Sequence, residues 1–231
     1  VVLNHQEVAA NSSYKVDTST PSVPTINAIA ALTNDNTPTI TGSADIGSTV
    51  TLFVDGVSQG AVIAGGSGTW SATLREANKL SDGGPYVFTA TASDDAGNVS
   101  ALSSSVSTTI DTQAPQVSSV IFVSHDEGTY AQLNAGDEVT FKVTFNDAVT
   151  LSPATGHSAP DSLKLDILIG NDEVSAQYKS GSPGTDLLFS YTIQQGQSAP
   201  SGIAIPADPI DLMTGATLTD GAGNNALVSF S

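Results

Sequence analysis

The clearest structural signal in the chain is the run Tyr86-Val-Phe-Thr-Ala-Thr-Ala-Ser-Asp-Asp-Ala-Gly-Asn98. Residues 86–93 alternate between two classes of side chain and are rich in β-branched and aromatic types, which predicts a half-buried strand. Residues 94–98 combine Asp, Gly and Asn, the composition of a turn. The run therefore reads as one strand that ends in a turn.

Similar runs, separated by turn residues at spacings of about 8–12 residues, fill most of the chain, and this pattern is typical of β-sandwiches. Helical periodicity is missing, and only Leu74–Leu80 offers one or two turns of helix. The predicted fold class is all-β, with two tandem β-sandwich domains. The other predicted strands are Thr37–Thr41, Thr49–Asp55, Gly68–Leu74, Ser104–Ile110, Val117–Val123, Glu138–Phe145, Leu163–Ile169, Ser175–Tyr178, Leu187–Ile193, Ile203–Ile205 and Ala226–Phe230.

Two short motifs occur twice in the same order, which indicates an internal repeat. Asp17-Thr-Ser-Thr-Pro-Ser-Val23 returns as Asp111-Thr-Gln-Ala-Pro-Gln-Val117, and Asp94-Asp-Ala-Gly-Asn98 returns as Asp220-Gly-Ala-Gly-Asn224. The first motif is typical of a stiff linker, because proline fixes φ and biases the preceding residue toward extended geometry. The predicted organisation is a C-terminal strand or linker of a preceding module in residues 1–16, one sandwich in 17–110 and a second in 111–231. We interpret the chain as a slice of a longer tandem array.

The charge balance excludes several classes of partner. The chain has 231 residues, 6 basic against 23 acidic side chains, a net charge of −17 and no cysteine. So few basic residues cannot neutralise a nucleic-acid backbone or bind an anionic membrane surface. No apolar run is long enough to span a bilayer, and no signal peptide is visible. Without cysteine, stabilisation by metal instead of disulfides is expected in an oxidising exterior.

No catalytic arrangement is recognisable, so the chain is predicted not to be an enzyme. The three histidines, His5, His125 and His157, show neither a nucleophile–base pattern nor metal-ligand spacing. A glycosidase with paired carboxylates would need an aromatic-rich cleft for sugar stacking, and no such cluster accompanies the aspartates.

Residues 17–111 resemble the bacterial Ig-like repeats of giant surface adhesins of the repeats-in-toxin and biofilm-associated types. The resemblance implies Ig-like (Greek-key) β-sandwich domains that serve as calcium-rigidified extenders, a minority of which hold ligands. The second module resembles a more divergent sandwich of the same adhesins. The matching segments are 34–44, 47–50, 68–70, 82–86 and 90–98 in the first module, and 140–145 with Val149, 187–193 and 218–224 in the second.

The aspartates fall where an Ig-like sandwich brings loops together. The B–C and F–G loops share the N-terminal end of such a sandwich, and the A–B and E–F loops share the other. Calcium takes 6–8 oxygen ligands, which carboxylates and turn carbonyls supply. Ordinary capping of turns by Asp is the alternative. The predicted calcium ligands are Asp17, Asp45, Asp94, Asp95 and Asn98 at the first linker, and Asp35, Asn36, Asp82, Asp111, Asp147, Asp220 and Asn224 at the second.

The predicted function is a calcium-rigidified extender of a secreted bacterial cell-surface adhesin, active in cell adhesion and biofilm formation. Neighbouring modules of the same chain are the expected partners, and the segment is expected to be a monomer. The alternative is recognition of a cell-surface glycan or peptide by residues 111–231, where the stretches Ala148–Ser162 and Tyr178–Asp186 are long enough to shape a pocket. A third interpretation is an accessory region of an extracellular polysaccharide-degrading enzyme.

Overall fold

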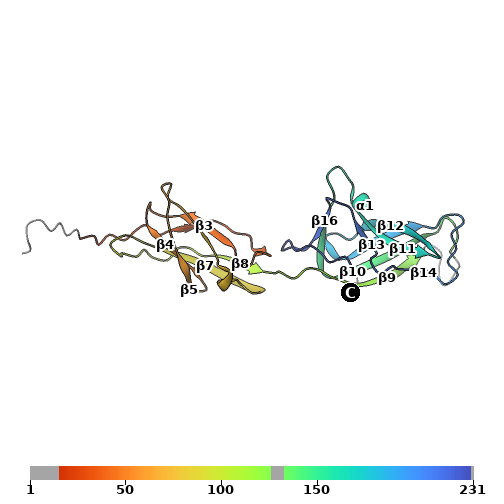
Figure 1. The fold of residues 1–231 in the computed structure, drawn as a ribbon, viewed down its shortest axis with the longest axis horizontal. Coiled ribbons are helices and arrows are strands. Elements are labelled where there is room, and N and C mark those ends of the chain that lie inside the picture. Colours follow the sequence, from red (N-terminus) through yellow and green to blue (C-terminus); the bar gives the residue numbers. More distant parts are fainter. Residues whose placement is uncertain (1–15, 126–132, 230–231) are drawn as a thin grey trace, which may run out of the picture. The chain divides into compact units, whose positions relative to one another are not determined.

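A computed structural model describes residues 16–125 and 133–229 (Figure 1). The predicted segment 1–16 thus lies outside the described residues, apart from Val16. The chain divides into two compact units. The first unit holds Thr37–Thr109 with the described residues before Leu32, and the second holds Leu32–Asn36 and the residues from Ile110 onward.

The first unit is a two-layer β-sandwich. Its smaller sheet has the order β1-β3-β6. The larger sheet has the order β2-β8-β7-β4-β5, although β2 and the last residue of β8, Ile110, group with the second unit by their contacts. A single 3₁₀ turn, Glu76–Asn78, follows β6. The strands are β1 (Thr25–Ile26), β2 (Leu32–Thr33), β3 (Thr39–Ser43), β4 (Thr49–Val54), β5 (Val57–Ile63), β6 (Thr69–Thr73), β7 (Gly83–Ser93) and β8 (Val106–Ile110).

Apolar side chains from both sheets of the first unit meet in one core. Ile40 and Trp70 come from the smaller sheet, while Val50, Leu52 and Phe88 come from the larger one. Along β4 every second residue is buried, as the period of two of a strand requires. Trp70 is only 3 % exposed. The expectation that the Gly-Thr-Trp turn delivers this side chain to the core is therefore confirmed.

The second unit is built around the long strand β10. Its sheet runs β14-β11-β12-β13-β10-β16, with β15 also paired to β11 and β9 to β10. Between Thr144 and Val149 the register of β10 shifts, and beyond this bulge the strand pairs with β16. The elements are β9 (Val117–His125), β10 (Glu138–Ser152), α1 (Ala159–Ser162), β11 (Leu163–Ile169), β12 (Asp172–Ser180), β13 (Gly184–Thr192), β14 (Ile203–Ala204), β15 (Ile210–Leu212) and β16 (Thr217–Thr219).

The core of the second unit is formed by alternating residues of its long strands. Val139, Phe141 and Val143 of β10 pack in one cluster with Leu165 and Ile167 of β11. All of these side chains are almost completely buried. The prediction of an all-β fold with β-sandwich domains is confirmed. None of the helices among the described residues has the length and apolar character needed to cross a membrane.

Several local features differ from the sequence prediction. The predicted strand Ala226–Phe230 does not form in its described residues, because Leu227 makes only an isolated bridge, to Gln116, and no ladder follows. The short strands β1, β2, β15 and β16 were not expected.

Strand β5 was not expected, and its burial shows no period of two, because it is a solvent-exposed edge strand carrying Gly60 at positive φ. The stretch Ala148–Ser162 is not an open loop, since β10 continues to Ser152 and α1 closes it. Tyr178–Asp186 is a tight β12–β13 hairpin. These two stretches therefore do not form long ligand-binding loops.

Replacing Gly42 by alanine is expected to destabilise the first unit. A Cβ at this position would overlap the carbonyl oxygen of Thr25 and lie 2.8 Å from the Trp70 ring. Forcing an extra carbon into a packed core costs about 1–3 kcal/mol. We expect Gly42→Ala to lower the melting temperature of the first unit by at least about 5 °C. Gly66→Ala is the control, because nothing lies within 4 Å of its added Cβ; equal melting temperatures for the two variants would contradict the packing argument.

Candidate metal centre

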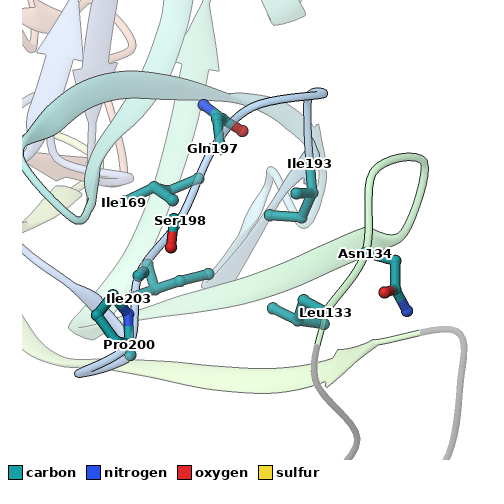
Figure 2. Close-up of a pocket in the computed structure, with 10 residues that line it drawn as sticks. Leu133, Asn134, Ile169, Ile193, Gln197, Ser198, Pro200 and Ile203 are labelled. Atoms are coloured by element: carbon teal, nitrogen blue, oxygen red, sulfur yellow. The ribbon is translucent and has the colours of Figure 1, made fainter.

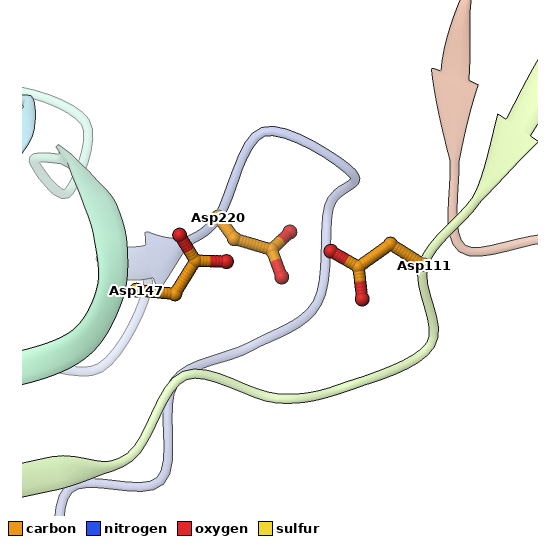
Figure 3. A group of neighbouring side chains, drawn as sticks. All are labelled: Asp111, Asp147 and Asp220. Carbon is orange, nitrogen blue, oxygen red and sulfur yellow. The ribbon is translucent and has the colours of Figure 1, made fainter. Parts of the chain in front are cut away.

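Three carboxylates converge at one end of the second unit (Figure 3). Asp111 opens the linker segment 111–117, Asp147 lies in the bulge of β10, and Asp220 begins the turn after β16. One oxygen from each lies within 4.8 Å of the others. Asp220 is buried, Asp111 is half-buried and Asp147 is exposed. Among the described residues, this is the only group of three acidic, histidine or cysteine ligands so close together.

Asp220 is held rigidly by the turn that it begins. Its Oδ1 accepts hydrogen bonds from the backbone N–H groups of Ala222, Gly223 and Asn224 at 2.8–2.9 Å. Its Oδ2 accepts one from the Asn224 side-chain amide at 2.8 Å. Gly223 has a φ of 95°, a conformation that glycine adopts without strain and that lets the turn curl around the carboxylate. This buried charge is thus stabilised by neutral donors.

The linker segment is fixed to the same turn. The Asn224 amide also donates to the backbone carbonyl of Asp111 at 2.8 Å, and the Asp111 side chain accepts from the N–H of Gln113 at 3.0 Å. Further along, the N–H of Gln116 donates to Asn146 Oδ1 at 2.7 Å, next to Asp147. These hydrogen bonds explain why Asp111, Asp147 and Asp220 lie close together although they are far apart in the sequence.

The first unit repeats this arrangement in part. The Asn98 amide donates to the Asp17 carbonyl at 3.1 Å and to Asp94 Oδ2 at 2.9 Å. Asp45, Asp94 and Asp95 line one pocket of about 350 Å³ together with residues 19–21 and 46–48. Asp45 Oδ2 accepts the N–H of Ser22 at 2.7 Å. These carboxylates therefore share a pocket, although they do not form a group as close as that of the second unit.

The remaining predicted ligands are more scattered. Asp35 and Asn36 group with the second unit, where the N–H of neighbouring Asn34 donates to the Ala222 carbonyl at 3.2 Å. Asp82 belongs to the first unit, directly before β7. None of the three belongs to the close carboxylate group. Sequence reasoning missed Asn146, whose side-chain oxygen accepts the Gln116 N–H and whose place beside Asp147 was the available signal. It also missed Asn34, which makes its contact through the backbone N–H, so its residue type gave no signal.

The opposite end of the second unit carries a pocket of about 490 Å³ (Figure 2). Buried Ile169 and Ile193 belong to its walls, and Asn134, Gln197 and Ser198 add polar groups. None of the described residues that line it is charged. It lies beside the start of β10, since the N–H of Gly136 donates to the Ile193 carbonyl, whereas the carboxylate group lies beside the bulge.

Comparison with known proteins agrees with the sandwich architecture. Residues 12–112 match the model of a family described as a bacterial Ig-like domain. This match supports the predicted Ig-like resemblance of residues 17–111, while the repeats-in-toxin subtype and the resemblance of the second module stay predictions. No curated protein matches the chain. Among solved structures, one described as "Biofilm associated protein - BSP domain" is 14% identical with a TM-score of 0.26. The match covers 91% of this chain, which spans 28% of that one.

The turn of the first unit predicts a pH-dependent stability. The pKa of Asp94 lies below its ordinary value of 3.8, chiefly because the Asn98 side chain donates to the carboxylate, with backbone N–H groups adding to the effect. A pKa lowered on folding contributes stability that is present above the unfolded pKa and is lost as pH falls through the folded one. In calcium-free buffer, Asp94→Asn should therefore unfold at lower temperature than wild type at pH 7, and the difference should shrink below about pH 3.8.

The single tryptophan, Trp70, reports this unfolding by fluorescence because it lies in the core of the first unit. Asp95→Asn is the matched control, since this neighbouring side chain is exposed. A loss of stability in Asp94→Asn that stays constant down to pH 2 would contradict the proposed role of the ionised carboxylate.

Proposed function

We propose that this chain is a non-enzymatic, calcium-rigidified extender segment of a secreted bacterial cell-surface adhesin that acts in adhesion and biofilm formation. The match of residues 12–112 to a bacterial Ig-like domain supports a structural module. The repetition of linker and turn motifs supports a tandem arrangement. The partners are neighbouring modules of the same protein and, at the far end of the adhesin, a cell-surface target.

The observation that carries the calcium proposal is the group of Asp111, Asp147 and Asp220 without a cationic partner. Two carboxylates about 4 Å apart repel by roughly 4 kcal/mol at an effective dielectric of 20. Among the described residues no lysine or arginine pairs with any of the three. The lysines of the second unit that form ion pairs do so elsewhere: Lys142 with Asp186 at 3.1 Å and Lys179 with Glu138 at 2.8 Å.

The donor set fits calcium chemically. Calcium is a hard cation that takes carboxylate and carbonyl oxygens in flexible geometry, and all three side chains here offer carboxylate oxygen. When bound, the ion supplies the missing positive charge and joins the linker segment to the β10 bulge and the turn after β16. The same proposal covers the pocket of Asp45, Asp94 and Asp95.

Calcium titration tests this proposal. We expect calorimetry to show binding with a dissociation constant of about 10⁻⁴–10⁻³ M, typical of extracellular modules. A hundredfold excess of calcium over that constant should stabilise the second unit by about 2.7 kcal/mol. Asp147→Asn should weaken binding at least tenfold without unfolding the unit, because this carboxylate is exposed and accepts only the adjacent N–H of Ala148.

Asp172→Asn is the control, since it removes an exposed carboxylate from the β11–β12 hairpin. Small-angle scattering of the same proteins tests the extender role: calcium should narrow the distribution of interdomain arrangements in wild type but not in Asp147→Asn. Superimposable curves with calcium and with chelator would show that the ion does not rigidify the chain.

A second candidate function is ligand recognition by the second unit, favoured by its uncharged pocket. The ten described residues that line the pocket carry no charge, in a chain with a net charge of −17. A neutral or apolar ligand therefore meets no charged group among them. The volume lies in the range of about 300–1,000 Å³ that small-ligand sites occupy. Its described lining contains no aromatic side chain. Because stacking on an aromatic ring is common in glycan sites, an aliphatic peptide side chain fits this lining better.

A peptide array with a parallel glycan array distinguishes these ligands. We expect peptides with a neutral aliphatic residue to be retained by wild type and lost with Ile203→Asp, which places a charge in the pocket wall. Ile121→Asp, an exposed position on β9, is the control. Retention of glycans alone, or equal retention by both variants, would refute peptide recognition at this pocket.

A further inference from the structure

The two linker segments are held by the same clamp in both units. In each, one asparagine amide bridges the backbone carbonyl of the linker aspartate and the carboxylate of the turn aspartate: Asn98 bridges Asp17 and Asp94, and Asn224 bridges Asp111 and Asp220. The clamped pairs are 81 and 113 residues apart in sequence. Each clamp therefore ties the beginning of a unit to its last turn.

The chemistry of the clamp assigns the amide a donor role. Both groups that it bridges are oxygen acceptors, and an amide NH₂ offers two donors, so each clamp uses both hydrogens of Nδ2. A carboxylate in the same place has no hydrogen to donate and would lie against two other oxygens. Asn98 and Asn224 were predicted as calcium ligands, with backbone carbonyls of the Gly-Asn turn among the ligand oxygens, and this stays a prediction because the clamp uses only the side-chain nitrogens.

We propose that Asn98 and Asn224 are positioning residues that dock each linker segment onto its own unit without any cation. The bond goes to the backbone carbonyl of the linker aspartate, so the side chain of that aspartate stays available. In both linkers this side chain makes the same second contact: Asp17 Oδ1 accepts the N–H of Ser19, and Asp111 Oδ1 accepts the N–H of Gln113, each at 3.0 Å. The clamp and this second contact together fix the position of the linker aspartate's carboxylate in each unit.

The clamp also sets the calcium response, a consequence that rests on the proposed function. Repulsion among the three carboxylates favours undocking of the linker, whereas the clamp opposes it. If only the docked linker offers the complete site, the observed dissociation constant is the intrinsic one divided by the docked fraction. Loss of the clamp should then weaken calcium binding by the same factor that it reduces docking.

Hydrogen exchange of the calcium-free second linker tests the clamp directly. In chelator, Asn224→Asp should speed amide exchange in residues 111–114 at least about tenfold, because two hydrogen bonds are lost and a like charge is added. Gln116 is an internal reference, since its N–H donates to Asn146 Oδ1 and not to the turn. Its exchange should change less than twofold.

Asn225→Asp is the matched control, because it adds the same charge one residue away at an exposed position. If residues 111–114 exchange alike in wild type, Asn224→Asp and Asn225→Asp, the clamp does not hold the linker and the proposal is wrong. If Asn224→Asp fails to fold, the same measurement is made on the first unit, where Asn98→Asp should speed amide exchange in residues 17–20. Calorimetry of the wild-type protein tests the calcium proposal independently. If calcium does not bind, the calcium proposal is wrong, but the clamp proposal is unaffected because its test is carried out in chelator.

Discussion

The exclusion of charged side chains from the strands is the constraint that determines where the acidic residues of the first unit lie. Strands β1 to β8 contain no Asp, Glu, Lys or Arg, because one face of each long strand is buried in the core and the other is occupied largely by hydroxyl and small side chains. The acidic residues are consequently confined to turns and linkers. Turns of a sandwich converge at its two ends, so a chain with this composition concentrates negative charge there.

The second unit also concentrates unpaired negative charge at one end, but for a different reason. Its strands do carry charges, and two of its lysines are paired on the sheet: Lys142 with Asp186 and Lys179 with Glu138. Asp166 accepts a hydrogen bond from the Ser175 hydroxyl. Pairing on the sheet leaves these lysines unavailable to the carboxylates beside the bulge. Among the described residues, the group of Asp111, Asp147 and Asp220 therefore lacks a positively charged partner for two reasons: the unit has many acidic residues, and two of its lysines are paired elsewhere.

Sequence periodicity predicted the strands that bury one face regularly, such as β4, β7, β10 and β11. It missed β5, whose exposed residues follow no period of two, and it ended β10 too early because the bulge at residues 146–148 interrupts the alternation. Turn composition located Asp111, Asp147 and Asp220. It could not show which of twelve predicted ligands converge, since that depends on the register of β10 with β16 and on hydrogen bonds spanning more than a hundred residues.

The role of the asparagines shows most clearly why residue type alone was insufficient. An Asn in a Gly-Asn turn beside aspartates fits both a calcium ligand, through its oxygen, and a clamp, through its nitrogen. The positions of the Asp111 carbonyl and the Asp220 carboxylate assign the donor role to the amide nitrogen, because two acceptors require a donor, while the calcium-ligand role of the asparagine stays a prediction. The turn aspartate organises the backbone, the asparagine fixes the linker to it, and the linker carboxylate is left facing its two neighbours. In the proposed calcium site, neutral amides set the geometry and like charges remain unpaired, so binding of the ion would require no rearrangement of the groups that hold its ligands.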